Sequence, residues 1–280
     1  MSLRCLVVAG SVWEIRGDRS SPADFLASRP MKLRNPGSAL PGRQASGASE
    51  TAALAGAADR PVDHTRFLRI AELYSSLQGE GAHSGLPCFF IRTGGCDLRC
   101  SWCDTPDALS GGQWASLDDL IAAIPDHVEL VQITGGEPLL QRDRVLALSG
   151  VLSVPPFNKK VLIETGGHLT LAGLPESLHI VMDVKLPASG ESRHDFAANF
   201  AHLKATDEIK FVVADRADFD AALDMASEHS LADRFQLLFS PVWGQLELRD
   251  LAEWLIASGL RARLQTQLHK HVWGGEASGV

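Results

Sequence analysis

The stretch Pro87–Cys103, PCFFIRTGGCDLRCSWC, shows in one place the pattern that decides the fold. It begins with a short apolar run, continues into two glycines and ends in a group of cysteines. The same order of apolar run and glycines returns in VELVQITGGEP at 128–138 and in KVLIETGG at 160–167. Nearly continuous apolar runs of this length are typical of strands covered on both faces. The sequence therefore predicts buried strands, each followed by a loop of flexible or reactive residues.

Strands and amphipathic segments alternate from residue 66 onward. Strands are expected at 66–74, 87–93, 128–134, 160–165, 179–186, 208–213, 235–240 and 261–267, and helices at 116–124, 215–229 and 246–259. Ser116 is a suitable N-cap for the first helix, and Gly259 a suitable C-terminal stop for the last. This alternation predicts an α/β fold with a parallel sheet and helical crossovers. Because nearly every expected strand ends in reactive or glycine-rich residues, a complete or partial (β/α) TIM-like barrel, which gathers these ends at one mouth, is favoured over an open doubly wound sheet.

Residues 1–63 differ in composition from the rest of the chain. The stretch 35–61 is built largely of Ala, Gly, Ser and Pro, with no period that would bury one face. We expect a disordered or poorly ordered extension at 1–63, followed by one core domain at 64–280. Met31 offers an alternative translation start.

The overall composition is that of an ordinary globular protein. The 280 residues are 45% hydrophobic and 21% charged, and the net charge of -8 argues against a nonspecific nucleic-acid-binding surface. No stretch approaches the roughly 20 apolar residues that span a bilayer, and Glu14 ends the N-terminal apolar run too early for a signal peptide. Five cysteines, three of them crowded together, indicate a reduced cytoplasmic protein that uses thiolates for chemistry or metal binding.

The crowded cysteines, Cys96, Cys100 and Cys103, have C-x3-C-x2-C spacing. A disulfide needs two cysteines and a closed zinc site needs four ligands, whereas a short loop can turn three thiolates toward one iron–sulfur cube. Three ligands leave one iron open to bind and cleave a ligand. Two alternatives remain: a zinc site with a fourth ligand such as His83, and a structural thiol cluster. Cys5 and Cys88 have no partner at ligand spacing and are interpreted as a tail thiol and a buried core thiol.

With Trp102 directly before the last cysteine, the triad resembles the signature of the radical S-adenosylmethionine superfamily. The resemblance implies one 4Fe-4S cluster on three cysteines and S-adenosylmethionine, which is cleaved to a 5'-deoxyadenosyl radical. TGGEP at 134–138 resembles the turn that holds the methionine part of this cofactor. Gly135 and Gly136 would let backbone approach the ligand, and Glu137 would support its ammonium group.

The residues that flank the cysteines resemble a narrower family. Residues 72–105 resemble the 7-carboxy-7-deazaguanine synthases over their whole length, and the likeness continues through about 67–273. It implies conversion of 6-carboxy-5,6,7,8-tetrahydropterin to 7-carboxy-7-deazaguanine with loss of ammonia, a lyase reaction in queuosine and 7-deazapurine biosynthesis. No catalytic residue beyond the cofactor and metal ligands is assigned.

Candidate substrate contacts come from two segments. Arg92 ends an apolar strand four residues before Cys96, so its guanidinium should project at the mouth and take a carboxylate in a bidentate pair; otherwise it is a surface arginine. LQGEG at 77–81 offers a donor and acceptor set for the guanidine-like edge of a pterin, although a plain turn would use the same glycines. The candidates in this segment are Leu77, Gln78, Gly79 and Glu80.

The resemblance adds further roles. Thr105 would coordinate Mg2+, a cation that prefers oxygen ligands, although Asp104-Thr105 alone reads as a turn or helix cap. Thr134 and His269 would contact substrate. His269 and Lys270 belong to a segment that closes the site in this family, but as isolated residues they would be solvated. Because the chain continues past Trp273, a substrate-binding terminal carboxylate is not expected.

The resemblance also carries over the contacts to S-adenosylmethionine. Asp183 or Lys185 would bind the ribose hydroxyls or the carboxylate, and Pro241 or Trp243 would pack on the adenine. The full candidate set is Trp102, Cys103, Asp104, Gly135, Gly136, Glu137, Asp183, Val184, Lys185, Ser240, Pro241, Val242 and Trp243.

The expected partners follow from the same resemblance. They are a small pterin substrate, a flavodoxin or ferredoxin as electron donor and a second copy of the chain in a homodimer, with no nucleic acid and no membrane. Two alternative functions remain. A glycyl-radical-enzyme activating protein shares the cysteine spacing, and a non-catalytic zinc- or cluster-bearing interaction module would use the same thiols.

Overall fold

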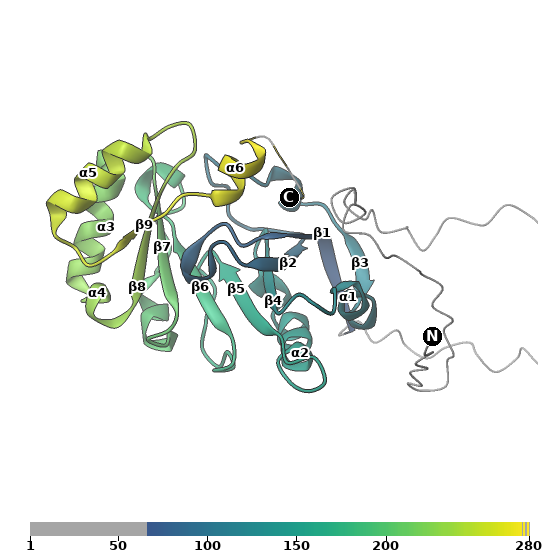
Figure 1. Ribbon diagram of the computed structural model, residues 1–280. Helices are drawn as coiled ribbons and strands as arrows, with labels where there is room; N and C mark the ends of the chain where they lie inside the picture. Colours follow the sequence, from purple (N-terminus) through teal and green to yellow (C-terminus); the bar gives the residue numbers. More distant parts are fainter. Residues whose placement is uncertain (1–65, 276, 278, 280) are drawn as a thin grey trace, which may run out of the picture.

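The computed structural model describes residues 66–275, 277 and 279; the predicted extension at 1–63 lies outside the described residues. Nine strands form a single sheet in the order β3-β1-β2-β4-β5-β6-β7-β8-β9. Their bounds are β1 (Phe67–Leu77), β2 (Pro87–Thr93), β3 (Gln113–Ser116), β4 (Leu130–Gly135), β5 (Lys160–Thr165), β6 (His179–Val184), β7 (Glu208–Val213), β8 (Gln236–Pro241) and β9 (Arg263–Leu264). Because β3 and β9 are not paired with each other, the sheet is a partial barrel (Figure 1).

The parallel sheet predicted from the sequence is confirmed for β2 and for β4 to β9, and it is wrong for the first strand. β1 pairs antiparallel with β2 and with β3. The chain between β1 and β2, residues 78–86, is too short for the crossover that parallel neighbours need, so the two strands form a hairpin-like pair. The four-residue β3 was not predicted, and in it Ala115 alone is buried, so it carries no apolar run.

Six α-helices accompany the strands in the described chain: α1 (Leu117–Ala123), α2 (Arg142–Leu152), α3 (Arg216–Glu228), α4 (Leu231–Arg234), α5 (Leu248–Ser258) and α6 (Leu268–Trp273). Two predicted helix signals are confirmed, because the Ser116 hydroxyl accepts a hydrogen bond from the Asp119 N–H at 3.1 Å and Gly259 ends α5 with a φ of 68°. Five short 3-10 helices lie between these elements: η3 (Gly81–His83), η4 (Pro106–Ala108), η5 (Pro138–Gln141), η6 (Pro187–Ser189) and η7 (Ala197–His202). No helix within 66–275 is long and apolar enough to cross a membrane.

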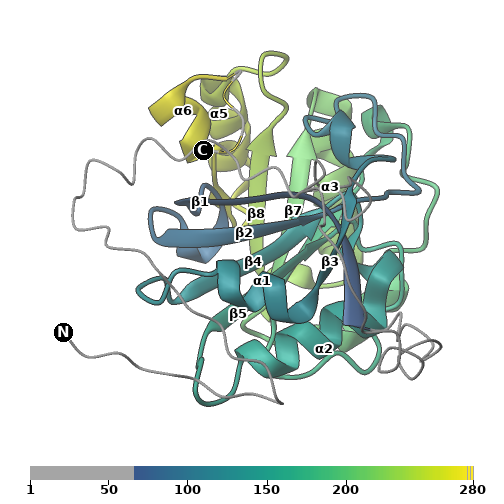
Figure 2. The same cartoon turned by 90° about the vertical axis from the view of Figure 1, so that its right-hand side faces the viewer.

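Helices α2 to α5 cover one face of the sheet. α2 packs on β1 and β5, α3 on β7, and α4 and α5 on β8, and Figures 1 and 2 show these helices outside the curve of the strands. The main hydrophobic core fills this space. A second, smaller core of Cys88, Phe90, Leu130 and Leu162, with Tyr74 packed against it, lies apart from the first. Cys88 is therefore the buried core thiol predicted from the sequence, and burial raises its pKa to about 12.

Alternation along each strand sorts the residues between the two faces. In β4, Val131 and Ile133 belong to the main core, whereas Gln132 and Thr134 line a cavity on the other face. Successive side chains of a strand point to opposite faces, so every second residue of β4 to β8 faces the inside of the partial barrel. This inner face is apolar at the beginnings of β2, β4 and β5, where the smaller core lies, and polar where the strands end.

Candidate active site

A cavity of about 560 Å3 opens on the inner face at the carboxyl ends of the strands. The predicted site residues that line it are Leu77, Gln78, Gly79, Glu80, Arg92, Cys96, Cys100, Trp102, Cys103, Asp104, Thr105, Thr134, Gly135, Gly136, Asp183, Lys185, Ser240, Pro241, Val242, Trp243 and His269. The fold thus brings together residues from nearly the whole described chain. Two predicted residues, Glu137 and Val184, are not in the lining.

The loop after β2 carries the three cysteines, and all three thiols are free. Backbone hydrogen bonds shape this loop: the Cys96 N–H donates to the Leu109 carbonyl at 3.1 Å and the Cys103 N–H to the Cys100 carbonyl at 3.2 Å. Burial raises the pKa of the Cys100 thiol, while the positive charge of Lys185 acts to lower it. The three thiols therefore share one wall of the cavity, with a cation beside them.

Glycines at the end of β4 allow close backbone contact with the end of β2. Gly135 has a φ of 139°, a conformation that L side chains rarely adopt. The Gly136 N–H donates to the Thr93 carbonyl at 3.1 Å, and a Cβ on Gly136 would overlap the carbonyl oxygen of Gly95. A larger residue here would push the cysteine loop away from β4, so the glycines set the position of both.

The Glu137 side chain faces the protein rather than the cavity. Its carboxylate accepts hydrogen bonds from the Leu139 N–H at 2.9 Å, the Thr165 hydroxyl at 2.8 Å and the Gly166 N–H at 2.8 Å. Only 1% of the residue is exposed, and burial raises its pKa. In the described conformation these three donors occupy the carboxylate, and its role in supporting an ammonium group stays a prediction. Through these bonds Glu137 joins the end of β4 to the end of β5.

Val184 lies outside the lining for a simpler reason. In β6, Asp183 lines the cavity, so the next residue must point to the opposite face. Val184 is accordingly fully buried in the main core. Lys185 follows the strand, lines the cavity again and pairs with Asp183 at 3.0 Å.

Arg92 lines the cavity and is held by three protein groups. Its guanidinium donates to the Tyr74 hydroxyl at 2.9 Å, to Glu72 at 3.3 Å and to the Thr105 hydroxyl at 3.4 Å. Its side chain is 18% exposed, which excludes the alternative of a free surface arginine. Burial raises the pKa of Tyr74 to about 12, so the hydroxyl stays protonated beside the cation.

Asp104 and Thr105 form a connected pair at the mouth. The Thr105 hydroxyl donates to Asp104 Oδ1 at 3.0 Å, and Asp104 Oδ2 receives the Gln267 amide at 3.0 Å and the Lys270 ammonium at 3.4 Å. Burial acts to raise the pKa of Asp104, but the hydrogen bond from Gln267 and the charge of Lys270 outweigh it and hold that pKa well below its usual range. The pair thus presents hard oxygen atoms with a permanent negative charge.

A charged layer crosses the interior below the mouth. The Lys210 ammonium contacts Glu80 at 3.0 Å, Asp183 at 3.3 Å and also Glu164. Burial acts to lower the pKa of Lys210, but the adjacent carboxylates raise it well above its ordinary value. Burial raises the pKa of Glu80 to about 7, with the charge of Lys210 opposing. Three carboxylates around one buried cation offer strong acceptors to a ligand.

Two amides extend this layer toward β2. Gln78 donates its amide to the Gln132 side chain, and Gln132 donates to Glu164 at 2.7 Å. The Thr134 hydroxyl donates to the same Glu164 oxygen at 3.3 Å. Glu164 therefore receives hydrogen bonds from β4 and an ion pair from β7, so its carboxylate is fixed in position.

The C-terminal segment closes over the segment that follows β1. The Leu268 N–H donates to the Gly79 carbonyl at 3.1 Å, and a Cβ on Gly79 would lie 2.5 Å from Nδ1 of His269. Lys270 lies over the Trp243 ring at 5.6 Å and is largely buried rather than solvated, contrary to what its position in the sequence suggests. Figure 1 shows α6 set apart from α3, α4 and α5.

Comparisons with known proteins agree with this geometry. A family model described as the radical SAM superfamily matches residues 90–187. The chain is 38% identical over 228 residues to 7-carboxy-7-deazaguanine synthase from Koribacter versatilis, which covers 76% of this chain and 100% of the relative. It is 38% identical over 217 residues to the synthase of the same name from Chlorobaculum tepidum, which covers 76% of this chain and 97% of the relative.

The chain belongs to the 7-carboxy-7-deazaguanine synthase family.

Among solved structures, the crystal structure of QueE from Escherichia coli is similar, with a TM-score of 0.58, 26% sequence identity and coverage of 71% of this chain and 94% of that chain. Membership of the 7-carboxy-7-deazaguanine synthase family makes this chain a radical SAM enzyme that acts on a small molecule with an iron–sulfur cluster and S-adenosylmethionine. The residues present fit these groups. Three free thiols line one cavity, and Asp183 Oδ1 is buried there without a hydrogen-bond partner, as a ligand-binding acceptor would be.

Several cavity residues of this synthase-family chain were missed by the sequence analysis. They include Tyr74, Gln132, Glu164, Lys210 and Gln267. Gln132, Glu164 and Lys210 each interrupt an apolar strand with a polar side chain, and this signal could have marked them as inward-facing. Gln267 carries no such signal, because its contact with the mouth depends on how the C-terminal segment folds back.

Proposed function

We propose that this chain is a carbon–nitrogen lyase that converts 6-carboxy-5,6,7,8-tetrahydropterin to 7-carboxy-7-deazaguanine with loss of ammonia, in queuosine and 7-deazapurine biosynthesis. The observation that carries the proposal is one cavity in which three free thiols on one wall face a layer of buried carboxylates, amides and cations. Its volume, about 560 Å3, is in the range of small-molecule sites. Relatives at 38% identity bear the name 7-carboxy-7-deazaguanine synthase.

The charged layer suits the pterin part of this substrate. Carboxylates accept hydrogen bonds from N–H groups, so Glu80 and Glu164 would accept from the guanidine-like edge of the ring. Gln78, Leu77 and Gly79 lie in the same segment as Glu80 and would pack beside the ring. Lys210 would donate to a carbonyl oxygen of the ring, because that oxygen would otherwise be repelled by the neighbouring carboxylates.

The substrate carboxylate is assigned to Arg92. A guanidinium binds a carboxylate through two parallel hydrogen bonds, and Arg92 is fixed in advance by Tyr74 and Glu72. Thr134 of β4 and His269 of α6, both in the lining, would complete the contacts around the ring. In this assignment the protein orients the ring toward the wall that carries the thiols.

The cofactor groups follow from the wall of thiols. Cys96, Cys100 and Cys103 would hold the cluster, which together with S-adenosylmethionine supplies a 5'-deoxyadenosyl radical when bound. The remaining contacts to S-adenosylmethionine are assigned to lining residues: Trp102, Asp104, Gly135, Gly136, Asp183, Lys185, Ser240, Pro241, Val242 and Trp243. Among these, Asp183 has a free buried acceptor oxygen suited to a ribose hydroxyl or an ammonium group.

A magnesium ion is proposed at Thr105. Mg2+ prefers oxygen ligands and takes few of them from protein. The Thr105 hydroxyl and the ionised Asp104 are adjacent, and Lys270 and Gln267 hold Asp104 in place. Substrate oxygens would fill further positions around the ion.

The partners of the enzyme are also proposals. Electrons would come from a flavodoxin or ferredoxin, and the chain would act as a cytoplasmic homodimer without direct nucleic-acid binding. The exposed Cys103 end of the cysteine loop offers a route for an electron donor to approach the thiol wall.

One assay tests the function directly. Reconstituted and reduced protein is incubated with 6-carboxytetrahydropterin, Mg2+ and S-adenosylmethionine, and the product is identified by mass spectrometry beside an active synthase of the same family. We expect 7-carboxy-7-deazaguanine, and no product from Cys100→Ala, which should also lose the colour of the cluster. Absence of product while the reference synthase is active would refute the proposal.

The same preparation separates the alternatives. A non-catalytic interaction module would hold zinc at the thiols, or would hold a cluster without cleaving S-adenosylmethionine. About four irons per chain with little zinc, together with cleavage of S-adenosylmethionine, supports a radical SAM enzyme. A glycyl-radical-enzyme activating protein would cleave S-adenosylmethionine yet leave the pterin unchanged.

A further inference from the structure

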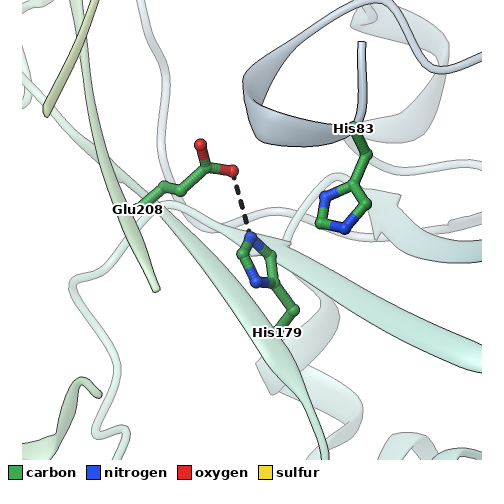
Figure 3. Close-up of side chains that lie close together, drawn as sticks. All are labelled: His83, His179 and Glu208. Carbon is green, nitrogen blue, oxygen red and sulfur yellow. Dashed lines mark hydrogen bonds and ion pairs between the residues drawn. The ribbon is translucent and has the colours of Figure 1, made fainter. Parts of the chain in front are cut away.

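Three titratable side chains meet at the opposite end of the inner face from the thiols. His179 is the first residue of β6 and Glu208 is the first residue of β7. His83 comes from η3, in the connection between β1 and β2. Figure 3 shows the two imidazole rings and the carboxylate close together, directed toward one another. One ligand atom from each residue lies within 4.8 Å of the others.

This group forms a layer beneath the charged layer of the active site. Glu208 and Lys210 are two residues apart in β7 and so point to the same face, as do His179 and Asp183 in β6. The carboxylate of Glu208 accepts the Ala82 N–H at 2.9 Å and contacts Nε2 of His179 at 3.0 Å. The group therefore lies beneath the charged layer and outside the cavity lining, where the β1–β2 connection is attached through Ala82.

The charges of the group are incomplete without a further cation. Glu208 is 1% exposed, and its ion pairs within the described chain include no lysine or arginine, only His179. A buried carboxylate without a full counter-charge is costly. His179 contacts one of the carboxylate oxygens at 3.0 Å, and a divalent cation would supply a full counter-charge.

His83 gives an independent indication of a missing ligand. The residue is 8% exposed, and its Nδ1 atom is buried without a hydrogen-bond partner. Its ring lies 4.9 Å from that of His179, centroid to centroid, at an interplanar angle of 79°. Burial lowers the pKa of His83, and the charge of Lys160 acts in the same direction, so the ring is neutral with a lone pair available. Buried polar atoms in proteins nearly always have a partner, so the unpaired nitrogen of His83 indicates a site for a bound ligand such as a metal ion.

We propose that His83, His179 and Glu208 form a binding site for one divalent metal ion, zinc by its ligand chemistry, distinct from the thiol wall. Two imidazole nitrogens and one carboxylate oxygen are a known zinc ligand set, with a fourth position for water. Binding displaces the proton between His179 and Glu208, either to the other ring nitrogen of His179 or to solvent. The ligand preference separates this site from Mg2+, which takes oxygen ligands.

The site would act as a clip beneath the substrate. Two residues of the β1–β2 connection, three positions apart, would hold it at two levels. Glu80 accepts a hydrogen bond from Lys210 in the charged layer, and His83 would bind the metal beneath that layer. Gly81, between them, has a φ of 70°, and a Cβ on it would lie 2.6 Å from the Glu208 carboxylate, so the backbone already lies close against Glu208. The metal would fix the segment 78–83, whose residues Gln78 and Glu80 line the cavity.

The test uses the anaerobic, cluster-loaded protein, so that the three cysteines are occupied. The protein is incubated with zinc chloride, freed of excess metal and analysed for zinc and iron by mass spectrometry. We expect about one zinc per chain in addition to the cluster iron, with an X-ray absorption spectrum that shows nitrogen and oxygen ligands and no sulfur at ~2.3 Å. Less than about a tenth of a zinc per chain, or zinc bound by sulfur, would overturn the proposal.

Variants then locate the ion. His83→Ala should weaken zinc binding by about 100-fold or more, since removing a group that only hydrogen-bonds a metal ligand already costs about 10–100-fold. His202→Ala, an exposed histidine of η7, is the matched control and should bind zinc as the original chain does. Equal zinc in His83→Ala and His202→Ala would overturn the assignment. The absorption spectrum of the unchanged protein decides the question even if His83→Ala does not fold.

A final measurement addresses the clip, and it needs no turnover. Zinc should slow amide hydrogen exchange of residues 78–86 in the original chain and leave it unchanged in His83→Ala. If the original chain binds zinc and exchange in this segment does not slow, the metal does not fix the segment. Because neither pterin nor S-adenosylmethionine is present, the result is independent of the proposed lyase activity.

Discussion

Lys210 should be the largest single electrostatic contribution to the stability of the cavity. Its side chain is 6% exposed and contacts Glu80, Glu164 and Asp183, each no more than 19% exposed. Lys210→Met keeps the length of the side chain and removes the charge. At the 3.0 Å distance to Glu80, the Coulomb attraction is about 5.5 kcal/mol with an effective dielectric constant of about 20. Breaking a buried pair on one side typically costs about 3–5 kcal/mol.

That loss corresponds to a clear thermal shift. At about 2–4 °C per kcal/mol for a domain of this size, the Tm of cluster-loaded Lys210→Met should fall by about 6–20 °C at pH 8. The assay is anaerobic differential scanning fluorimetry. Arg249→Met is the control, because Arg249 forms an exposed pair with Glu253 on α5, and such pairs contribute at most about 1 kcal/mol.

The pH dependence gives a second check with a defined sign. Glu80 has its pKa raised from 4.5 to about 7, by burial against the opposing charge of Lys210, so removing Lys210 raises that pKa further in the folded protein. A carboxyl whose folded pKa lies above its unfolded value costs stability as pH rises through that interval. The Tm deficit of Lys210→Met should therefore be larger at pH 8 than at pH 6. A Tm within about 3 °C of the original chain at pH 8, or a deficit that grows at pH 6, would refute the reasoning.

Three further outcomes are expected from single changes. Gly136→Ala places a Cβ on the carbonyl oxygen of Gly95, so iron per chain after reconstitution should fall by more than half; full iron loading would contradict the close contact. Arg92→Ala should keep its iron and its uncoupled cleavage of S-adenosylmethionine while the KM for the pterin rises about tenfold or more, since a charge-assisted hydrogen bond contributes about 1.5–3 kcal/mol; an unchanged KM would remove Arg92 from substrate binding. Glu137→Ala leaves the Thr165 hydroxyl and the N–H groups of Leu139 and Gly166 without their acceptor. The free energy of unfolding, measured in urea, should fall by about 2–4 kcal/mol. A loss below about 1 kcal/mol would show that the carboxylate does not join β4 to β5.

The sequence by itself determined the features that depend on local pattern. Apolar runs located β2 and the strands from β4 to β8, because strands buried on both faces leave few polar positions. Ser116 and Gly259 marked helix ends because their effects act within one turn of backbone. The spacing of Cys96, Cys100 and Cys103 identified a shared site because a short loop cannot carry its thiols far apart.

Tertiary structure decided what depends on pairing between distant segments. The antiparallel direction of β1 follows from the short connection that precedes β2, and the role of Glu137 follows from the N–H and hydroxyl donors that the end of β5 brings to it. The three carboxylates of the charged layer come from β5, β6 and the segment after β1, and they meet Lys210 only because the inner faces of those strands converge. The sequence gives the identity of these side chains. The strength of their charge interactions depends on burial, and burial arises only when the curved sheet encloses them.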